Sequence, residues 1–234
     1  MTETSLFAGP VRGSALDLDG VLLDGMPFHY EAFNAALHTF GVHGSEREVA
    51  LLEGMRTREV IKRIANSHGV FPEDSELDEA ERLKRKIYST IFHPQLMPGA
   101  IELVSLLAQR GCRLAIVTGT ADASAHAAVQ ALHAESLFNV IISHDSNIPM
   151  KPDPAPYATA ARQLSVAPEQ CLAIENAPAG LASAVGAGLR CFAVASYLER
   201  ADLQGAERVF ETLADLTAWL SERRGRDTNG NWVV

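Results

Sequence analysis

The chain has 234 residues, with 29 acidic against 20 basic side chains and a formal net charge of −9. This length allows one large domain with a sizeable core, or a domain that carries an insertion. The acidic balance argues against nucleic acid and anionic membranes as partners, and no apolar run approaches the roughly 20 residues that cross a bilayer. We expect a cytoplasmic protein, with a monomer favoured, whose partner is a small molecule.

The first apolar segment, ALDLDGVLLDG, runs directly into carboxylates, with Asp17 and Asp19 at its end. One interpretation is an Asp-Gly turn between two strands of a hairpin. An EF-hand calcium loop is excluded, because Val21 and Leu22 stand where that loop needs an oxygen ligand and a glycine. A third interpretation is an aspartate nucleophile beside a second acid at the carboxyl end of a parallel strand.

Residues 27–96 predict helices and no convincing strand. Pro27 favours the start of one helix, and Asp78 with Glu81 is typical of a capping box at the start of another. We therefore expect this segment to be an inserted helical cap domain. Asp24 is expected to support the hinge before it rather than the chemistry.

From residue 98 onward, helical and strand patterns alternate. The expected helices lie near 98–110, 122–134, 154–164 and 178–187, and the expected strands are RLAIV, NVIIS, CLAIE and RCFAVA. With a first strand near 14–18, this pattern predicts an α/β fold: a Rossmann-like parallel sheet with helices on both faces, built from residues 1–26 and 97–222. Residues 223–234 are polar and are expected to form a flexible tail. The three cysteines fall in apolar segments and are expected to be reduced core residues.

Polar residues follow several of these strands, at the edge where a parallel sheet places its functional groups. Thr118 and Gly119 offer a hydroxyl and an open backbone N–H to a phosphate oxygen. Lys151 is held in a turn by the proline after it, and Glu175 and Asn176 offer oxygens suited to Mg²⁺. Each has an ordinary interpretation as a turn, a surface lysine or a helix cap. Taken together, they are hard to assign to packing.

The motif DLDGVLLD, together with Thr118, the Lys-Pro pair at Lys151 and the segment IENAPAG, resembles the haloacid dehalogenase superfamily of phosphohydrolases. The inserted helical cap is similar to that of the β-phosphoglucomutase-like branch. The resemblance implies that Asp17 attacks phosphorus and forms an aspartyl-phosphate. It implies that Asp19 acts as the acid and then the base, while Thr118 and Lys151 bind the phosphoryl group.

The resemblance also implies a Mg²⁺ cofactor. Its expected ligands are Asp17, the backbone carbonyl of Asp19, Asn176, and Glu175 directly or through water. Many relatives carry Glu-Asp where this chain has Glu175-Asn176. Because the amide is neutral, we expect weaker metal affinity.

Substrate choice is expected to depend on polar side chains of the cap. The candidates are His29, Glu53, Arg56, Arg58 and Lys86. His29 is favoured because the branch commonly carries a histidine there, and Lys86 resembles the cap lysine of the mutases.

Three functions remain open after this comparison. The first is a Mg²⁺-dependent phosphatase acting on a small phosphorylated metabolite, either a phosphomonoester or pyrophosphate. The second is a β-phosphoglucomutase-type mutase, and the third is a non-catalytic phosphate-binding protein. Thr57 stands where a gap-free comparison with mutase-type caps suggests arginine, which favours hydrolysis.

Overall fold

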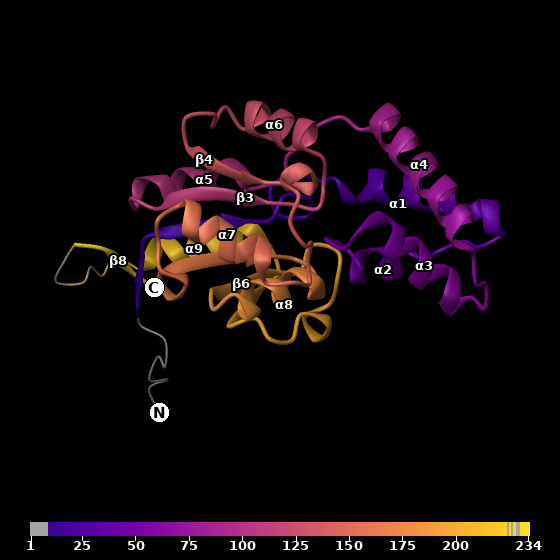
Figure 1. Ribbon diagram of the computed structural model, residues 1–234. Coiled ribbons are helices and arrows are strands. Elements are labelled where there is room, and N and C mark those ends of the chain that lie inside the picture. The colour runs from indigo at the N-terminus through magenta and orange to yellow at the C-terminus, as the bar shows by residue number, and fades with distance from the viewer. Residues whose placement is uncertain (1–8, 224, 226, 228–229) are drawn as a thin grey trace.

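The computed structural model describes residues 9–223, 225, 227 and 230–234. Within them, parallel strands form a six-stranded sheet in the order β4-β3-β2-β5-β6-β7 (Figure 1). The strands are β2 (Gly13–Leu16), β3 (Arg113–Val117), β4 (Phe138–Ile142), β5 (Cys171–Glu175), β6 (Arg190–Val194) and β7 (Arg208–Phe210). β2 lies between β3 and β5, so the chain order reverses around it. The carboxyl end of β2 is therefore the switch point where such sheets bind ligands.

Helices cover both faces of the sheet, because successive strand residues point to opposite sides. Ala15 and Ala173 belong to the core cluster on one face, with α7 and α8, and Leu16 and Ile174 to the cluster on the other face, with α5, α6 and α9. The helices are α5 (Ala100–Gln109), α6 (Asp122–Ala131), α7 (Ala155–Gln163), α8 (Pro178–Gly186) and α9 (Leu213–Glu222). The predicted α/β class, with a parallel sheet and helices on both faces, is confirmed.

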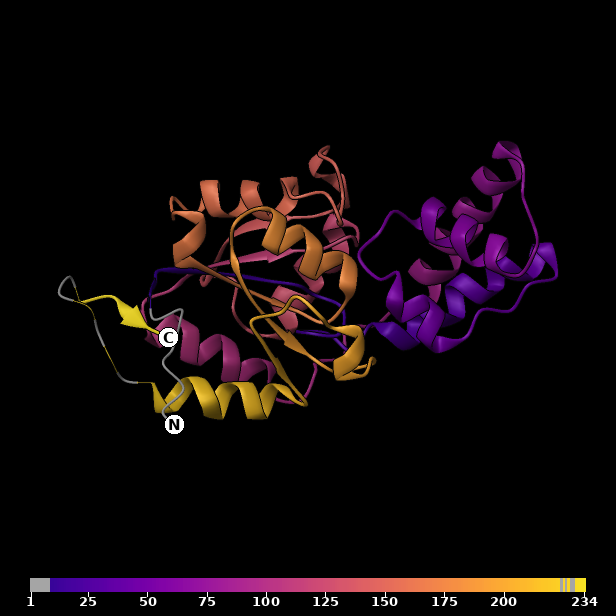
Figure 2. The same ribbon diagram turned by 90° about the horizontal axis from the view of Figure 1, so that it is seen from below.

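A group of helices between β2 and α5 lies to one side of the sheet, as Figures 1 and 2 show. They are α1 (Met26–Leu37), α2 (Glu46–Leu51), α3 (Thr57–Ser67) and α4 (Asp74–Ile91). The main contact within this group is between α1 and α4. We call this group the cap. The expected capping box at Asp78 and Glu81 is wrong: α4 begins earlier, and Glu73 and Glu76 form the box.

The C-terminal end packs against the core instead of fraying. β8 (Trp232–Val233) pairs antiparallel with β1 (Pro10–Val11), and the Trp232 indole N–H donates to the Arg223 carbonyl over 2.6 Å. Trp232 is 1% exposed. Of the tail expected at 223–234, residues 224, 226, 228 and 229 lie outside the described residues. The rest differs from the expectation because this single indole buries a large apolar area.

Short 3₁₀ turns connect several elements. They are η1 (His38–Phe40), η2 (His144–Ser146), η3 (Pro168–Gln170) and η4 (Arg200–Asp202).

Among the described residues, the three cysteines are buried and free, as expected. None of the helices in the described part of the chain is long and apolar enough to cross a membrane.

Candidate active site

Asp17 lies at the centre of a buried charge cluster at the carboxyl end of β2. Its side chain is fully buried, and its Oδ1 atom accepts a hydrogen bond from Lys151 Nζ over 2.5 Å. The same ammonium lies 2.7 Å from Glu175 Oε1 at the end of β5. Tyr157 of α7 donates to that Glu175 oxygen over 2.5 Å. The structure therefore brings together residues from three distant parts of the sequence around one cation.

Burial dominates the electrostatics of this cluster. Burial and the nearby charges of Glu175 and Asp19 raise the pKa of Asp17 to about 8, against the opposing effect of Lys151. Burial also disfavours the charged form of Lys151, but the surrounding carboxylates outweigh it and raise the pKa of the ammonium above its ordinary value. When Asp17 is ionised, its carboxylate beside the charged Lys151 ammonium is suited to attack on an anionic group, because the cation offsets the repulsion.

Asp19 points to the same site through the turn after β2. Its Oδ2 atom accepts a hydrogen bond from Thr120 Oγ1 over 2.7 Å and lies 3.4 Å from His29 Nε2. Burial disfavours its charged form, yet His29 and Thr120 hold the pKa of Asp19 below its ordinary value. Gly20 makes this turn possible: its φ is +85°, and a Cβ there would lie 2.2 Å from Asn176 Nδ2.

Thr118, Gly119 and Thr120 follow β3, beside Asp19. Thr118 is buried, and its Oγ1 atom accepts the Thr120 N–H over 3.0 Å. Gly119 lies under the cap, because a Cβ there would meet the carbonyl oxygen of Gly54 at 3.2 Å. Thr120 was not predicted as a site residue. The pattern T-G-T contains its signal, a second hydroxyl two residues after the first.

Unpartnered oxygens identify where a cation would fit. Asp17 Oδ2, Asp19 Oδ1 and Asn176 Oδ1 are buried and have no hydrogen-bond partner among the described residues. Oxygen donors of this kind suit Mg²⁺. Glu175 differs: its Oε2 accepts the Asn176 N–H over 3.1 Å, and its Oε1 faces Tyr157 and Lys151. Among the expected ligands, Asp17 and Asn176 thus offer side-chain oxygens without a partner. Both carboxylate oxygens of Glu175 already have partners within the protein.

Glu53 reaches this cluster from the cap. Its carboxylate, with those of Asp17 and Glu175, has oxygens within 4.8 Å of one another. The charges of all three raise the pKa of the buried Lys151 ammonium. Lys151 forms ion pairs with Asp17 and Glu175, whereas Glu53 Oε2 is buried and has no hydrogen-bond partner among the described residues. The contact also places the turn after α2 directly over the site, where a Cβ on Gly54 would lie 2.8 Å from Lys151 Cδ.

His29 and Lys84 link the cap to Asp19. Lys84 Nζ lies 3.0 Å from His29 Nδ1 and 4.6 Å from the ring centres of Phe33 and Tyr88. Lys84 is 5% exposed, and burial lowers its pKa to about 8. The lysine predicted from the sequence was Lys86 instead. The missed signal is the spacing of buried residues in α4, where Lys84 continues the apolar stripe of Leu77, Ala80 and Tyr88.

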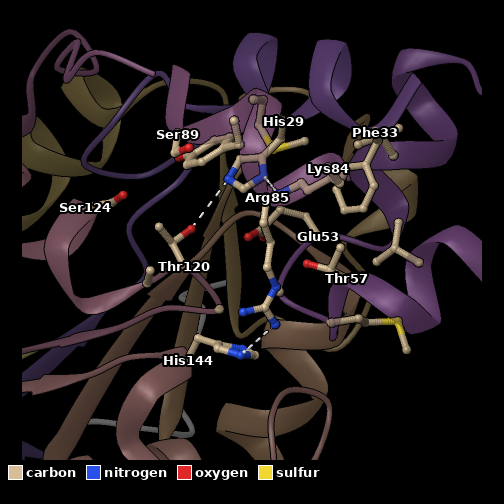
Figure 3. A pocket seen from close by; sticks show the side chains of 18 of the residues that line it. His29, Phe33, Glu53, Thr57, Lys84, Arg85, Ser89, Thr120, Ser124 and His144 are labelled. Carbon is tan, nitrogen blue, oxygen red and sulfur yellow. Dashed lines mark hydrogen bonds between the residues drawn. The ribbon is translucent and has the colours of Figure 1, made fainter. Parts of the chain in front are cut away.

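A cavity of about 470 Å³ lies between the cap and the strand ends (Figure 3). Of the predicted cap residues, His29, Glu53 and Lys86 line it, as does Thr57. Arg56 and Arg58 are not among its lining residues. Arg58 pairs instead with Asp74 and Asp78 of α4, because its helix position directs it to the cap surface. The structure thus corrects the expectation for Arg58, while Gly119 and Thr120 form part of the cavity wall.

The site combines a buried acid after β2, a lysine from the loop before α7 and an acid at the end of β5, and helices inserted after β2 cover it. This combination is typical of one class of hydrolase. The sequence model of the haloacid dehalogenase-like hydrolases matches residues 11–188. The chain therefore belongs to this family.

Individual relatives narrow the class. Protein CbbY of Cereibacter sphaeroides is 30% identical over 88% of this chain and 94% of its own. Phosphoglycolate phosphatase of Rhodospirillum rubrum is 27% identical over 87% of this chain and 88% of its own. A putative β-phosphoglucomutase structure from Bacteroides vulgatus superimposes with a TM-score of 0.78 at 25% identity, over 89% of this chain and 87% of that one. The chain lies in the β-phosphoglucomutase-like branch of the family.

Proposed function

We propose that the protein is a Mg²⁺-dependent phosphatase that hydrolyses a small phosphorylated metabolite through an aspartyl-phosphate on Asp17. The observation that carries the proposal is the buried Asp17 carboxylate held 2.5 Å from Lys151, with a second acid, Asp19, facing the same site. The relatives support the reaction class, because phosphatases are among them.

The first step forms a bond between an Asp17 oxygen and phosphorus and breaks the bond to the leaving oxygen. Lys151 offsets the repulsion between the Asp17 carboxylate and the phosphate dianion. Arrival of that dianion raises the pKa of Asp19, so that Asp19 binds a proton and donates it to the leaving oxygen. In the second step the Asp19 carboxylate takes a proton from a water that attacks phosphorus, and Asp17 is released.

We propose that the Asp17 carboxylate, Asn176 and the Asp19 backbone carbonyl hold the Mg²⁺ ion. The open oxygens on Asp17 and Asn176 support this assignment. When bound, the ion supplies positive charge that stabilises the transferring phosphoryl group. Thr118 and Gly119 bind phosphate oxygens, and the cap, proposed to comprise residues 27–96, excludes water during transfer.

The test is release of phosphate from p-nitrophenyl phosphate by wild type and by Asp17→Asn, with Mg²⁺ and with EDTA. The amide is nearly isosteric but does not attack phosphorus, so we expect complete loss of turnover with the fold unchanged by circular dichroism. Asp215→Asn, in the first turn of α9 and remote from the site, is the matched control. Full activity in EDTA would contradict the Mg²⁺ requirement. More than a few per cent of wild-type turnover in Asp17→Asn would contradict the assignment of Asp17 as the nucleophile.

A mutase is the second candidate, supported by the likeness to a putative β-phosphoglucomutase. Mutase-type caps suggest an arginine at the position of Thr57, and in this chain the neutral Thr57 lines the cavity there. Hydrolysis is therefore favoured. Incubation with β-glucose 1-phosphate and catalytic glucose 1,6-bisphosphate decides between them, and faster formation of glucose 6-phosphate than of free phosphate would establish the mutase.

A further inference from the structure

One end of the cavity, opposite His29 in Figure 3, is basic. Arg85 of α4 extends toward η2 of the core, where its Nη2 atom lies 3.0 Å from His144 Nε2. Lys86 lines the same cavity. The backbone N–H of His144 donates to the Thr120 carbonyl over 3.0 Å, so this basic end begins beside the residue that contacts Asp19.

The contact between Arg85 and His144 joins two basic side chains. Burial and the positive charges of Arg85 and Arg56 hold the pKa of His144 below its ordinary value, while Asp145 and Glu81 oppose them. The imidazole is therefore neutral and accepts a hydrogen bond from the guanidinium.

The acidic residues near Arg85 leave most of the hydrogen-bond donors of its guanidinium available. Glu81 accepts a single hydrogen bond from Arg85, at Nη2, over 2.7 Å. Among the described residues, Arg85 Nε and Nη1 form no hydrogen bond, and the side chain is 49% exposed, so both groups are open to a ligand from the cavity. Among the described residues that line the cavity, Glu53 is the one acid, and its carboxylate has an oxygen within 4.8 Å of oxygens of Asp17 and Glu175.

We propose that Arg85, positioned by His144, binds a second anionic group of the substrate. The substrates are then phosphomonoesters whose leaving group carries a carboxylate or a second phosphate. This inference rests on the proposed phosphatase function. The planar guanidinium fork matches both anions, and the free N–H groups of Arg85 point to the ligand chemistry. A neutral polyol leaves these donors without an acceptor of matching charge.

Three esters on one carbon chain test this proposal: propyl phosphate, its carboxylate analogue 3-phosphooxypropanoate, and propane-1,3-diol bisphosphate. We expect kcat/KM for at least one of the two esters with an anionic leaving group to exceed that of propyl phosphate by about tenfold or more, the size of one charge-assisted hydrogen bond. The preferred ester identifies the second group as carboxylate or phosphate.

Arg85→Met is expected to reduce that preference by about tenfold. Arg82→Met is the matched control, because Arg82 is exposed on the same helix and is not among the cavity residues, and it is expected to keep the preference. A preference that survives Arg85→Met overturns the proposal. So does equal or absent turnover of the three esters by wild type that hydrolyses p-nitrophenyl phosphate. No phosphate release from any ester, including p-nitrophenyl phosphate, is instead the failure of the phosphatase function.

Discussion

Two buried lysines show how the core and the cap differ. Lys151 of the core is 2% exposed and lies between Asp17 and Glu175, whose charges raise its pKa. Lys84 of the cap is 5% exposed and contacts two aromatic rings and His29, and burial lowers its pKa to about 8. The core holds its cation by charge, whereas the cap holds its cation mainly by packing. Substitutions at the two positions should therefore act in different ways.

The largest effect is expected for Lys151→Met. Its loss leaves the Glu175 carboxylate buried without a cation and raises the pKa of Asp17 further, so the free energy of unfolding should fall by about 3–5 kcal/mol at pH 7. Turnover should fall at least about a hundredfold, because the phosphate loses its cationic partner. Urea denaturation and phosphate release measure the two effects. The exposed Lys62→Met is the control, and a stability loss under about 1 kcal/mol contradicts the charge-holding role.

A smaller effect, with a distinct pH dependence, is expected for Lys84→Met. Between about pH 8 and the ordinary lysine value of 10.5, the unfolded chain binds a proton that the folded chain does not. Wild-type stability relative to the variant should therefore rise with pH in this window, at most about 1.4 kcal/mol per unit. Below pH 8 the charged lysine costs desolvation in the fold, so the apolar variant should be at least as stable.

The measurement is the difference in unfolding free energy between wild type and Lys84→Met at pH 7.5 and at pH 10. We expect wild type to gain about 2 kcal/mol relative to the variant between these two values. Other groups that titrate in this range cancel in the difference. A difference that does not change with pH shows that Lys84 is not desolvated in the folded protein.

The difference between the core and the cap also explains which site residues could be predicted from the sequence. A parallel sheet brings the carboxyl ends of its strands to one edge, so Asp17, Thr118 and Glu175 could be placed together once the strands were recognised. Thr120 was not predicted, because the direction of a side chain in a turn does not follow from the strand pattern. The packed tail escaped because the pairing of β8 with β1 joins segments from opposite ends of the chain.

Cap residues were harder to place, because their direction depends on how each helix faces the core. Each residue turns a helix by about 100°, so a choice of Lys86 over Lys84 selects another face. Lys86 reaches the cavity wall, but Lys84 contacts His29. Arg58 shows the same limit, since its charge was visible in the sequence and its pairing with α4 was not.

The smallest effect is expected for Arg58→Gln. Its Nη2 atom lies 2.6 Å from Asp74 Oδ1, and its Nη1 atom forms a second ion pair with Asp78, but the Asp74 side chain is 91% exposed. Exposed ion pairs contribute little, so the free energy of unfolding should change by less than about 1 kcal/mol. Because the guanidinium is engaged with α4 outside the cavity, kcat/KM should stay within about twofold of wild type. Steady-state assays of Arg58→Gln and Lys84→Met compare two positions of the same cap. A tenfold loss of kcat/KM in Arg58→Gln alone would show that Arg58 binds the substrate.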